Sequence, residues 1–365
     1  MSDATEALEA LRVAVAHGLP GAARASGGAP RLTAEVIALA TRHRVQGLLW
    51  SAIDAGALVG AEQQVEDARN AQLAAMRTCL IAEETAVLAL EALSAADVDA
   101  RVLKGIAVAH LDHTDPAERV FGDSDILIRR DDYPRALRAL IVAGFRRAEP
   151  PVRDWWEQRF GKAIVWYAPS GGELDLHLAI TGGYFGERIN HEYLWSSASP
   201  PFDLGGVTAR GLDSEGRLLH ACCHAVLGGG SGLRARRDVA QLVLLSGADW
   251  PGAVACAQHD EVECVLAEAA RATWAELSLD SGHPFARWAH SHASDPVQQR
   301  ALAGYVAAFE QGWAPEGRGV LAALGAVDKV RFLSGLAVPS RSSMRFRQRT
   351  WRQQLRTGAA ALRRR

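Results

Sequence analysis

Two short acidic motifs carry the clearest chemical signal in the sequence: GDSDILI over residues 122–128 and ELDLH over residues 173–177. Side chains of a strand alternate between its two faces, so Asp123 and Asp125 are expected to project from one face, about 7 Å apart. If the second motif forms a strand beside the first, Asp175 becomes a third carboxylate of the same group. Carboxylates gathered in this way repel one another unless a divalent cation lies between them.

Three carboxylates on adjacent strands are typical of sites for two-metal phosphoryl transfer. In such sites, one Mg²⁺ activates the attacking oxygen and the other holds the triphosphate and the leaving pyrophosphate. We therefore predict that Asp123, Asp125 and Asp175 are catalytic residues that bind two Mg²⁺ ions, with Mn²⁺ as the alternative cation. The competing interpretation is a surface Asp-x-Asp pattern in which Asp125 caps a turn.

A second signal precedes the acidic motifs, where the apolar stretch ending at Leu103 runs into Lys104-Gly105. A helix is predicted to follow, and a strand–glycine–helix junction lets backbone N–H groups and the helix dipole face a phosphate. Lys104 and Arg119 are predicted to add positive charge against a triphosphate. The alternatives are a simple turn at Gly105 and an ordinary surface arginine at Arg119.

The remaining sequence predicts the elements that hold these residues in place. Residues 1–97 show helical spacing of apolar residues throughout, and the predicted helices cover 3–17, 33–43, 45–58 and 61–96. No combination of residues in this N-terminal helical region indicates chemistry, so we interpret the region as a support.

Residues 98–212 combine short apolar runs with turns and one clear helix over 131–143, which Gly144 ends. The PSGG segment at 169–172 joins two apolar runs and predicts a β-hairpin. Strands and helices in this order indicate an α+β core with a mixed sheet.

Residues 213–329 predict a helical C-terminal domain, and residues 330–365 form an Arg-rich tail. The predicted helices cover 214–227, 233–246, 249–258, 261–277, 295–310 and 317–331. The GGGSG segment at 228–232 lacks the spacing of a phosphate-binding P-loop and is interpreted as a hinge.

The composition is that of an ordinary globular protein, with 365 residues and a formal net charge of −2. Its five cysteines form no C-x-x-C pair, the N-terminus has no signal-peptide pattern, and no 18-residue stretch is free of charge. We therefore expect a cytoplasmic protein that has no membrane partner.

The near-neutral total hides an asymmetry of charge. The tail contains ten arginines and no acidic residue, which leaves 30 basic and 42 acidic residues, or a charge of −12, for residues 1–329. The charge argument against general nucleic-acid binding therefore applies to residues 1–329 but not to the tail. The tail is predicted either to bind RNA or an acidic partner, or to fold back as a helix against the acidic body, which we favour.

The segment from Val102 to Arg147 resembles the core of the nucleotidyltransferase superfamily that has the polymerase-β-like fold. More narrowly, it is similar to a bacterial group called uncharacterised nucleotidyltransferases, with its pattern LKG…R…GDxDLLV…L…GF…DLH. The matching positions are Leu103, Lys104, Gly105, Arg119, Gly122, Asp123, Asp125, Ile126, Leu127, Gly144, Phe145, Asp175, Leu176 and His177. The resemblance implies an α+β nucleotidyltransferase core flanked by N-terminal and C-terminal helical regions.

The resemblance also implies roles for these residues and for a later helix pair. Metal binding falls on Asp123, Asp125 and Asp175. The implied nucleotide-binding residues are Lys104, Gly105, Arg119, Gly122, His177, His224, Arg237 and Asp238. His220, four residues before His224, is interpreted as a helix-packing residue, because zinc binding would need a further ligand. One departure is Ser124, where a branched apolar residue is more usual.

The implied reaction is the transfer of a nucleoside monophosphate from an NTP, with ATP as the first candidate, to an acceptor. Small molecules, peptides and RNA remain open as acceptors. One alternative is a kinase-like enzyme that transfers a phosphoryl group on the same fold. The other is a non-catalytic nucleotide-binding partner in a biosynthetic or toxin–antitoxin system.

Overall fold

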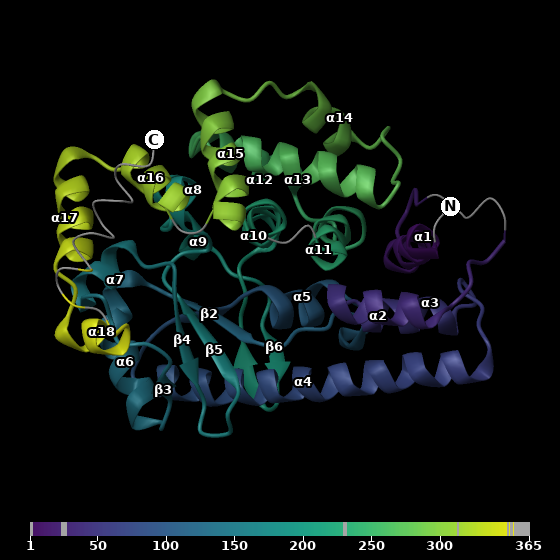
Figure 1. The fold of residues 1–365 in the computed structure, drawn as a ribbon, viewed down its shortest axis with the longest axis horizontal. Coiled ribbons are helices and arrows are strands. Elements are labelled where there is room, and N and C mark those ends of the chain that lie inside the picture. Colours follow the sequence, from purple (N-terminus) through teal and green to yellow (C-terminus); the bar gives the residue numbers. More distant parts are fainter. Residues whose placement is uncertain are drawn as a thin grey trace.

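The computed structural model describes residues 3–22, 28–228, 232–311, 314–348, 350 and 353. Its centre is one five-stranded sheet in the order β1-β2-β5-β4-β3 (Figure 1). The strands are β1 (Ala100–Val102), β2 (Ser124–Ile128), β3 (Arg146–Arg147), β4 (Ala163–Tyr167) and β5 (Glu173–His177). The β2–β5 pairing is parallel and the other three pairings are antiparallel. The predicted α+β fold with a mixed sheet and flanking helices is confirmed.

The N-terminal helices begin and end within a few residues of the predicted bounds. They are α1 (Asp3–Ala16), α2 (Ala34–His43), α3 (Gln46–Asp54) and α4 (Glu62–Ala95). Thr33 caps α2, since its side chain accepts a hydrogen bond from the backbone N–H of Val36 at 3.3 Å. Local apolar spacing and capping were sufficient signals for these helices.

The two faces of the sheet differ in what covers them. Leu174 and Leu176 of β5 lie on the face that packs against α4 and α6 (Tyr133–Val142), in one hydrophobic cluster. Ser124 of β2 points the same way, and its hydroxyl donates to the carbonyl of Ala82 on α4. That hydrogen bond explains how a serine is accommodated where an apolar residue was expected.

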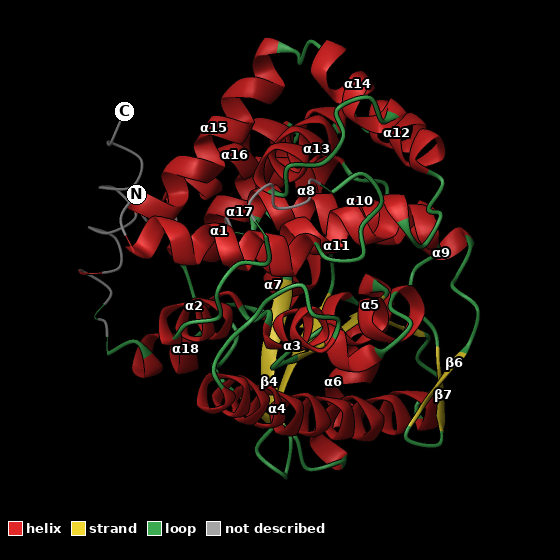
Figure 2. Cartoon of the chain, turned by 90° about the vertical axis from the view of Figure 1, so that its right-hand side faces the viewer, coloured by secondary structure: helices red, strands yellow, loops and turns green. Residues whose placement is uncertain are grey.

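The C-terminal helices lie over the opposite face of the sheet. Figure 2 shows α4 at the bottom, the strands in the middle and α10, α11 and α13 above them. The helices of this layer are α10 (Ser214–Leu227), α11 (Leu233–Leu244), α12 (Trp250–His259), α13 (Glu263–Glu276), α14 (Pro284–Ser291), α15 (Pro296–Gln311) and α16 (Ala314–Ala323). A single hydrophobic cluster contains residues of α1–α3 as well as of α10–α14, so the two ends of the chain share one core.

Several predicted boundaries need correction. The prediction of a single helix over 317–331 is wrong, because Gly325 adopts an extended conformation that separates α16 from α17 (Ala326–Ala337).

Gly144 has the expected place after α6. It adopts the left-handed conformation, at φ 85°, that is typical of a glycine at the C-terminal end of a helix. Short elements that no pattern indicated are α7 (Asp154–Phe160), α8 (Gly183–Arg188), α9 (Tyr193–Ser196), β6 (Phe202–Leu204) and β7 (Val207–Ala209).

The described part of the Arg-rich tail folds back onto the body. After α17 it forms α18 (Arg341–Phe346), and the backbone N–H of Ser340 donates to the carbonyl of Val152 at 2.6 Å. Arg347 lies 3.7 Å from a carboxylate oxygen of Glu149. The RNA prediction covers the tail from residue 330, and most of the tail beyond residue 348 lies outside the described residues. No helix in the described part of the chain is long and apolar enough to cross a bilayer.

Candidate functional site

The parallel pairing of β2 with β5 brings the two acidic motifs together. Asp125 is directly opposite Asp175 in the register, and Leu127 is opposite His177. Ligand atoms of Asp125, Asp175 and His177 all lie within 4.8 Å of one another, on the sheet face that the C-terminal helices cover. The predicted approach of Asp175 to Asp125 is therefore present in the fold. We call these three residues the acidic cluster.

The third member of the acidic cluster is a histidine whose ring is held by two contacts. His177 Nε2 lies 2.8 Å from Asp125 Oδ1 and 4.0 Å from Asp175 Oδ2. Nδ1 lies 3.1 Å from the carbonyl oxygen of Ala179. When Nδ1–H donates to that carbonyl, the lone pair of Nε2 faces the carboxylates, which is the usual orientation of a metal-binding histidine. Burial lowers the pKa of His177, with Lys104 adding to the effect, and this favours the neutral ring.

The oxygens of Asp175 supply a further observation about what the acidic cluster can bind. Asp175 Oδ1 is buried, and it has no hydrogen-bond partner among the described residues. A buried oxygen of this kind costs free energy unless a ligand satisfies it. A group of two carboxylates and one imidazole, in which one carboxylate oxygen has no hydrogen-bond partner, fits a divalent cation.

Asp123 does not belong to this close group. It lies one residue before β2 and is partly exposed, outside the set of ligand atoms within 4.8 Å. Its charge nevertheless contributes to the raised pKa of Asp175. The fold therefore places Asp123 at the border of the acidic cluster, where its role as a metal ligand stays a prediction.

Lys104 reaches the acidic cluster from the first residue of α5 (Lys104–Asp112). Its ammonium forms an ion pair with Asp125 and lies 3.3 Å from His177 Nε2. Burial opposes the ionisation of Asp125, but the adjacent ammonium of Lys104 favours it, and the pKa of that carboxyl lies well below its usual range. Asp125 is therefore an ionised carboxylate at all ordinary pH values.

Asp175 has the opposite character. Burial and the charge of Asp125 raise its pKa to about 6, while Lys104 opposes the rise. Two neighbouring carboxyls whose environments separate their pKa values in this way can serve as an acid–base group and a permanent anion. The arrangement suits Asp175 to accept a proton near neutral pH.

The raised pKa of Asp175 predicts a pH-dependent cost to stability in the metal-free protein. The rise from 3.8 to about 6 corresponds to about 3 kcal/mol, which is absent below pH of about 4 and fully present above about 6. An Asp175→Asn variant is therefore expected to be up to about 3 kcal/mol more stable than the wild type above about pH 7, with little difference near about pH 4. Urea unfolding in the presence of a chelator measures this. Stability curves that run parallel over the whole pH range would contradict it.

Close packing requires a glycine at Gly105, whereas a side chain at Gly122 would make only ordinary contacts. A Cβ at Gly105 would collide with the side chain of Phe121, so the glycine lets α5 approach the turn before β2. A Cβ at Gly122 would lie 3.5 Å from Nη1 of Arg44, a residue of the N-terminal helical region. Their predicted contacts with a nucleotide stay predictions.

Arg119 and Asp238 form a buried ion pair between the core and α11. Arg119 Nε lies 2.6 Å from Asp238 Oδ1 and Nη2 lies 2.7 Å from Oδ2, while Nη1 donates to the carbonyl of Val120. Arg119 is only 3% exposed, so the alternative of a surface arginine is wrong. These contacts already occupy the guanidinium that was expected to bind the triphosphate.

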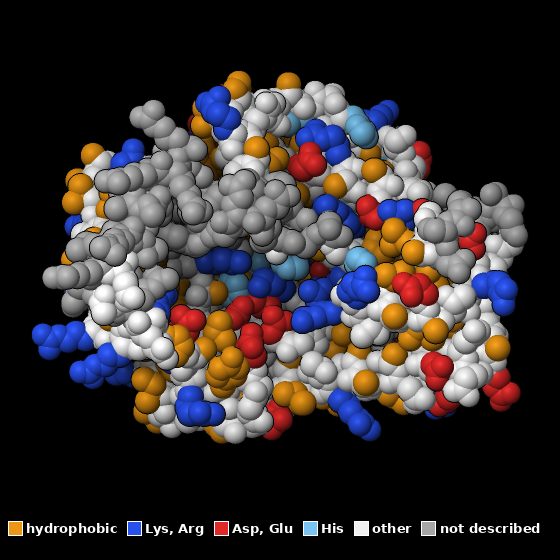
Figure 3. All heavy atoms as spheres, in the orientation of Figure 1, with side chains coloured by type: hydrophobic (Ala, Val, Ile, Leu, Met, Phe, Trp, Pro, Cys, Tyr) orange, Lys and Arg blue, Asp and Glu red, His pale blue; other side chains and the backbone are white. Residues whose placement is uncertain are grey.

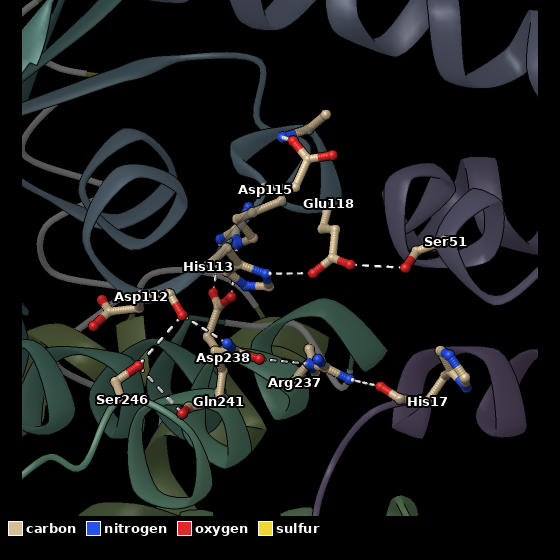
Figure 4. Close-up of polar contacts among 12 residues, drawn as sticks. His17, Ser51, Asp112, His113, Asp115, Glu118, Arg237, Asp238, Gln241 and Ser246 are labelled. Carbon is tan, nitrogen blue, oxygen red and sulfur yellow. Dashed lines mark hydrogen bonds and ion pairs between the residues drawn. The ribbon is translucent and has the colours of Figure 1, made fainter. Parts of the chain in front are cut away.

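Arg237 is buried, and its guanidinium contacts the N-terminal helical region. Its Nη1 donates to the carbonyl of Val15, in the last turn of α1, at 2.6 Å and to that of His17, just after α1, at 2.7 Å. Figure 4 shows the contact with His17. Nε of Arg237 donates to Gln241 on the next turn of α11. The expected position of Arg237 in a nucleotide cleft therefore needs correction, because its charge is used to attach α1 to α11.

His220 and His224 of α10 line a small cavity of about 20 Å³ together with Lys104 and Asp238. This volume accommodates about one water molecule. Nε2 of His220 is buried and has no partner among the described residues. Burial, followed by the charges of Lys104 and Arg234, lowers the pKa of His224 to about 3, so the ring is neutral. Both histidines border the site, whereas only His224 was expected to do so.

Two arginines near the site were not singled out from the sequence. Arg44 follows α2, and Arg234 lies in the first turn of α11. The RARRD run at residues 234–238 was a visible signal for Arg234, but nothing near Arg44 in the sequence distinguishes it from other helix-end arginines. Figure 3 shows basic, acidic and histidine side chains gathered in the hollow between the C-terminal helices and the layer below.

A larger cavity of about 510 Å³ borders the sheet on the side of β4. Its lining includes Val165 and Glu173, and Val165 pairs directly with Asp175 across the β4–β5 ladder. The far wall includes Trp156 of α7 and Phe332 of α17, whose rings are 5.3 Å apart. The cavity therefore begins beside the acidic cluster and ends against the C-terminal helices.

Residues 31–274 match the model of a family described as uncharacterised nucleotidyltransferase. No curated protein matches the chain. The matched region contains β1 to β5, the acidic cluster, and α10 and α11.

Proposed function

The chain belongs to the family of uncharacterised nucleotidyltransferases, and we propose that it transfers a nucleoside monophosphate from an NTP, with ATP tested first, to an acceptor. The observation that carries this proposal is the parallel register of β2 and β5, which sets Asp125 opposite Asp175. The ion pair between Lys104 and Asp125 adds positive charge at the same place.

The acidic cluster would hold the divalent cation that this chemistry uses. Asp125, Asp175 and His177 would bind it, with Asp123 as a further ligand from the border of the cluster. When bound, the cation would stabilise the charge of the triphosphate and lower the pKa of an attacking hydroxyl. Carboxylate oxygens suit Mg²⁺, whereas the imidazole of His177 also suits Mn²⁺. We propose two Mg²⁺ ions and keep Mn²⁺ as the alternative.

The chain's own residues have distinct tasks in this proposal. Asp175, which lies beside the cavity proposed for the acceptor, helps to deprotonate the acceptor hydroxyl. Lys104 neutralises negative charge that develops on the phosphates. Gly105, Gly122 and His224 border the nucleotide. Arg119, Asp238 and Arg237 position the surrounding helices through the contacts described above.

The acceptor is proposed to enter through the cavity beside β4. Its volume of about 510 Å³ lies within the usual range for small-molecule sites. Val165 and Glu173 continue the sheet face that carries Asp175, so a ligand in the cavity would lie next to the proton acceptor. A small molecule or the end of a peptide fits these dimensions better than a folded RNA.

The proposal is tested with the full-length chain and each of the four NTPs, in Mg²⁺ or in Mn²⁺. Calorimetry first measures metal-dependent NTP binding, and pyrophosphate release is then followed with a panel of small-molecule, peptide and RNA acceptors. Mass spectrometry of the product separates the chemistries: a gain of one nucleotidyl group supports the proposal, and a gain of one phosphoryl group indicates the kinase-like alternative. Absence of metal-dependent NTP binding would contradict the proposal and favour a non-catalytic partner.

A further inference from the structure

We propose that Arg44 and Arg234 form an anion site beside Asp123 that binds the β- and γ-phosphates of the donor nucleotide. The identity of the ligand rests on the proposed nucleotidyl transfer, whereas the anion site itself rests on the placement of the two arginines. These residues come from the end of α2 and from α11, two elements that belong to one hydrophobic core.

Arg44 is held in place by its backbone. It ends α2 in the left-handed conformation, at φ 53° and ψ 51°, and its N–H bonds to carbonyls of the last helical turn. Its guanidinium stands over the turn that leads into β2, since a Cβ at Gly122 would lie 3.5 Å from Nη1. The next residue of that turn is Asp123, so the charge of Arg44 lies at the border of the acidic cluster.

The segment that carries Arg44 is also fixed against the loop before β2. Gly47, at the start of α3, packs so closely against the carbonyl of Ala117 that a Cβ would collide with it. The hydroxyl of Ser51 donates to Glu118 at 2.7 Å, one helical turn further along α3. Figure 4 shows this contact continuing through Glu118 to His113. The approach of Arg44 to the site is therefore built into the packing.

Arg234 approaches the same place from α11, because the charges of Arg44 and Asp123 both act on it. It is half-buried in the first turn of α11, one turn before Asp238. Burial and the neighbouring charge of Arg119 lower its pKa to about 10, and Arg44 adds to this effect while Asp238 and Asp123 oppose it. The N-terminus of α11 adds partial positive charge beside Arg234.

The charges at this point are not balanced within the described residues. Arg119 forms the close ion pair with Asp238. Within the described part of the chain, neither Arg44 nor Arg234 has a carboxylate oxygen within 4.0 Å. Two guanidinium groups that repel each other and lack close counter-ions are stabilised by a multivalent anion, and their planar forks match phosphate oxygens.

The position of Arg44 and Arg234 relative to the acidic cluster indicates which part of the donor nucleotide they would bind. A nucleotide whose α-phosphate lies at the acidic cluster must place its remaining phosphates to one side. Asp123 and Gly122 connect the cluster to Arg44, and Asp123 also lies close enough to Arg234 for their charges to interact. The leaving pyrophosphate would therefore be held by residues outside the sheet.

The test uses Arg44→Asn, Arg234→Gln and the double variant in the full-length chain. Asparagine is chosen at position 44 because it tolerates the left-handed backbone better than alanine does. Calorimetry measures the binding of inorganic tripolyphosphate, of Mg²⁺–NTP and of the matching nucleoside monophosphate. Each single variant is expected to weaken tripolyphosphate and NTP binding by about 10- to 100-fold, with little change for the monophosphate.

The controls test whether the loss of binding depends on the positions of Arg44 and Arg234 or only on the loss of a positive charge. Arg42→Ala removes an exposed arginine two residues away and is expected to leave all three affinities unchanged. Arg234→Lys keeps the charge and is expected to retain part of the binding, while thermal melts check that each variant is folded. If the double variant binds tripolyphosphate as tightly as the wild type, or the wild type does not bind it, the anion site is refuted. Tripolyphosphate binding that needs both arginines, without any nucleotidyl transfer, would support the anion site and reject the proposed function.

Discussion

An Asp125→Asn variant is expected to lose nucleotidyl transfer by about 10³-fold or more. Asp125 is the ionised member of the acidic cluster, and it contacts both Lys104 and His177. Removing its charge would take away a metal ligand that is worth several kcal/mol in the transition state, and about 4 kcal/mol corresponds to this factor. Pyrophosphate release with the NTP and acceptor identified for the wild type measures the loss.

The same substitution also tests whether the loss comes from the site or from unfolding. Lys104 would lose its ion-pair partner, so some loss of stability is expected, and circular dichroism with urea unfolding measures it. Asp203→Asn on β6 is the matched control, since it removes an exposed carboxylate outside the sheet core, and its activity should equal that of the wild type. Activity of a folded Asp125→Asn variant within about tenfold of the wild type would contradict the assignment.

An Arg119→Leu variant is expected to destabilise the fold by about 3–5 kcal/mol. The substitution leaves the carboxylate of Asp238 buried without its close partner, and removal of one member of a buried pair costs about this much. The carbonyl of Val120 also loses a donor. The free energy of unfolding in urea, at neutral pH, measures the effect.

The double variant Arg119→Leu/Asp238→Leu separates the ion pair from simple loss of packing. Because it removes both charges, it is expected to be less destabilised than the sum of the two single variants. Burial opposes the ionisation of Asp238, but Arg119 outweighs it and lowers its pKa, so the pair should stabilise the fold less as the pH falls below about 4. If Arg119→Leu weakened NTP binding but changed stability by less than about 1 kcal/mol, Arg119 would instead be the phosphate ligand that the sequence suggested.

Local patterns were sufficient for much of the fold. The helices of residues 1–97, the hairpin at 169–172 and the helix that Gly144 follows depend on apolar spacing, caps and turn residues close together in the chain. Where such signals were weak, the prediction failed, as at Gly325, where one expected helix is two. Short helices such as α7 lack enough turns for a clear periodicity.

The division between sequence and tertiary structure is clearest at the site. Alternation along a strand was enough to put Asp175 and His177 on one face, and the chemical nature of the acidic motifs was evident from residue type alone. Only the tertiary structure decided that β2 and β5 pair in the register that sets Asp125 opposite Asp175. Strand register depends on the packing of whole faces, which no short motif contains.

The arginines also show that the sequence does not reveal which charged side chains face the site. Arg119 and Arg237 looked like ligands, yet they bind Asp238 and the end of α1, while Arg44 stands over the turn before Asp123. A guanidinium forms its contacts with whatever the fold brings near, often more than 100 residues away in the chain. The sequence by itself determined which charges exist, and the packing of the two helical regions around the sheet decided which of them face the site.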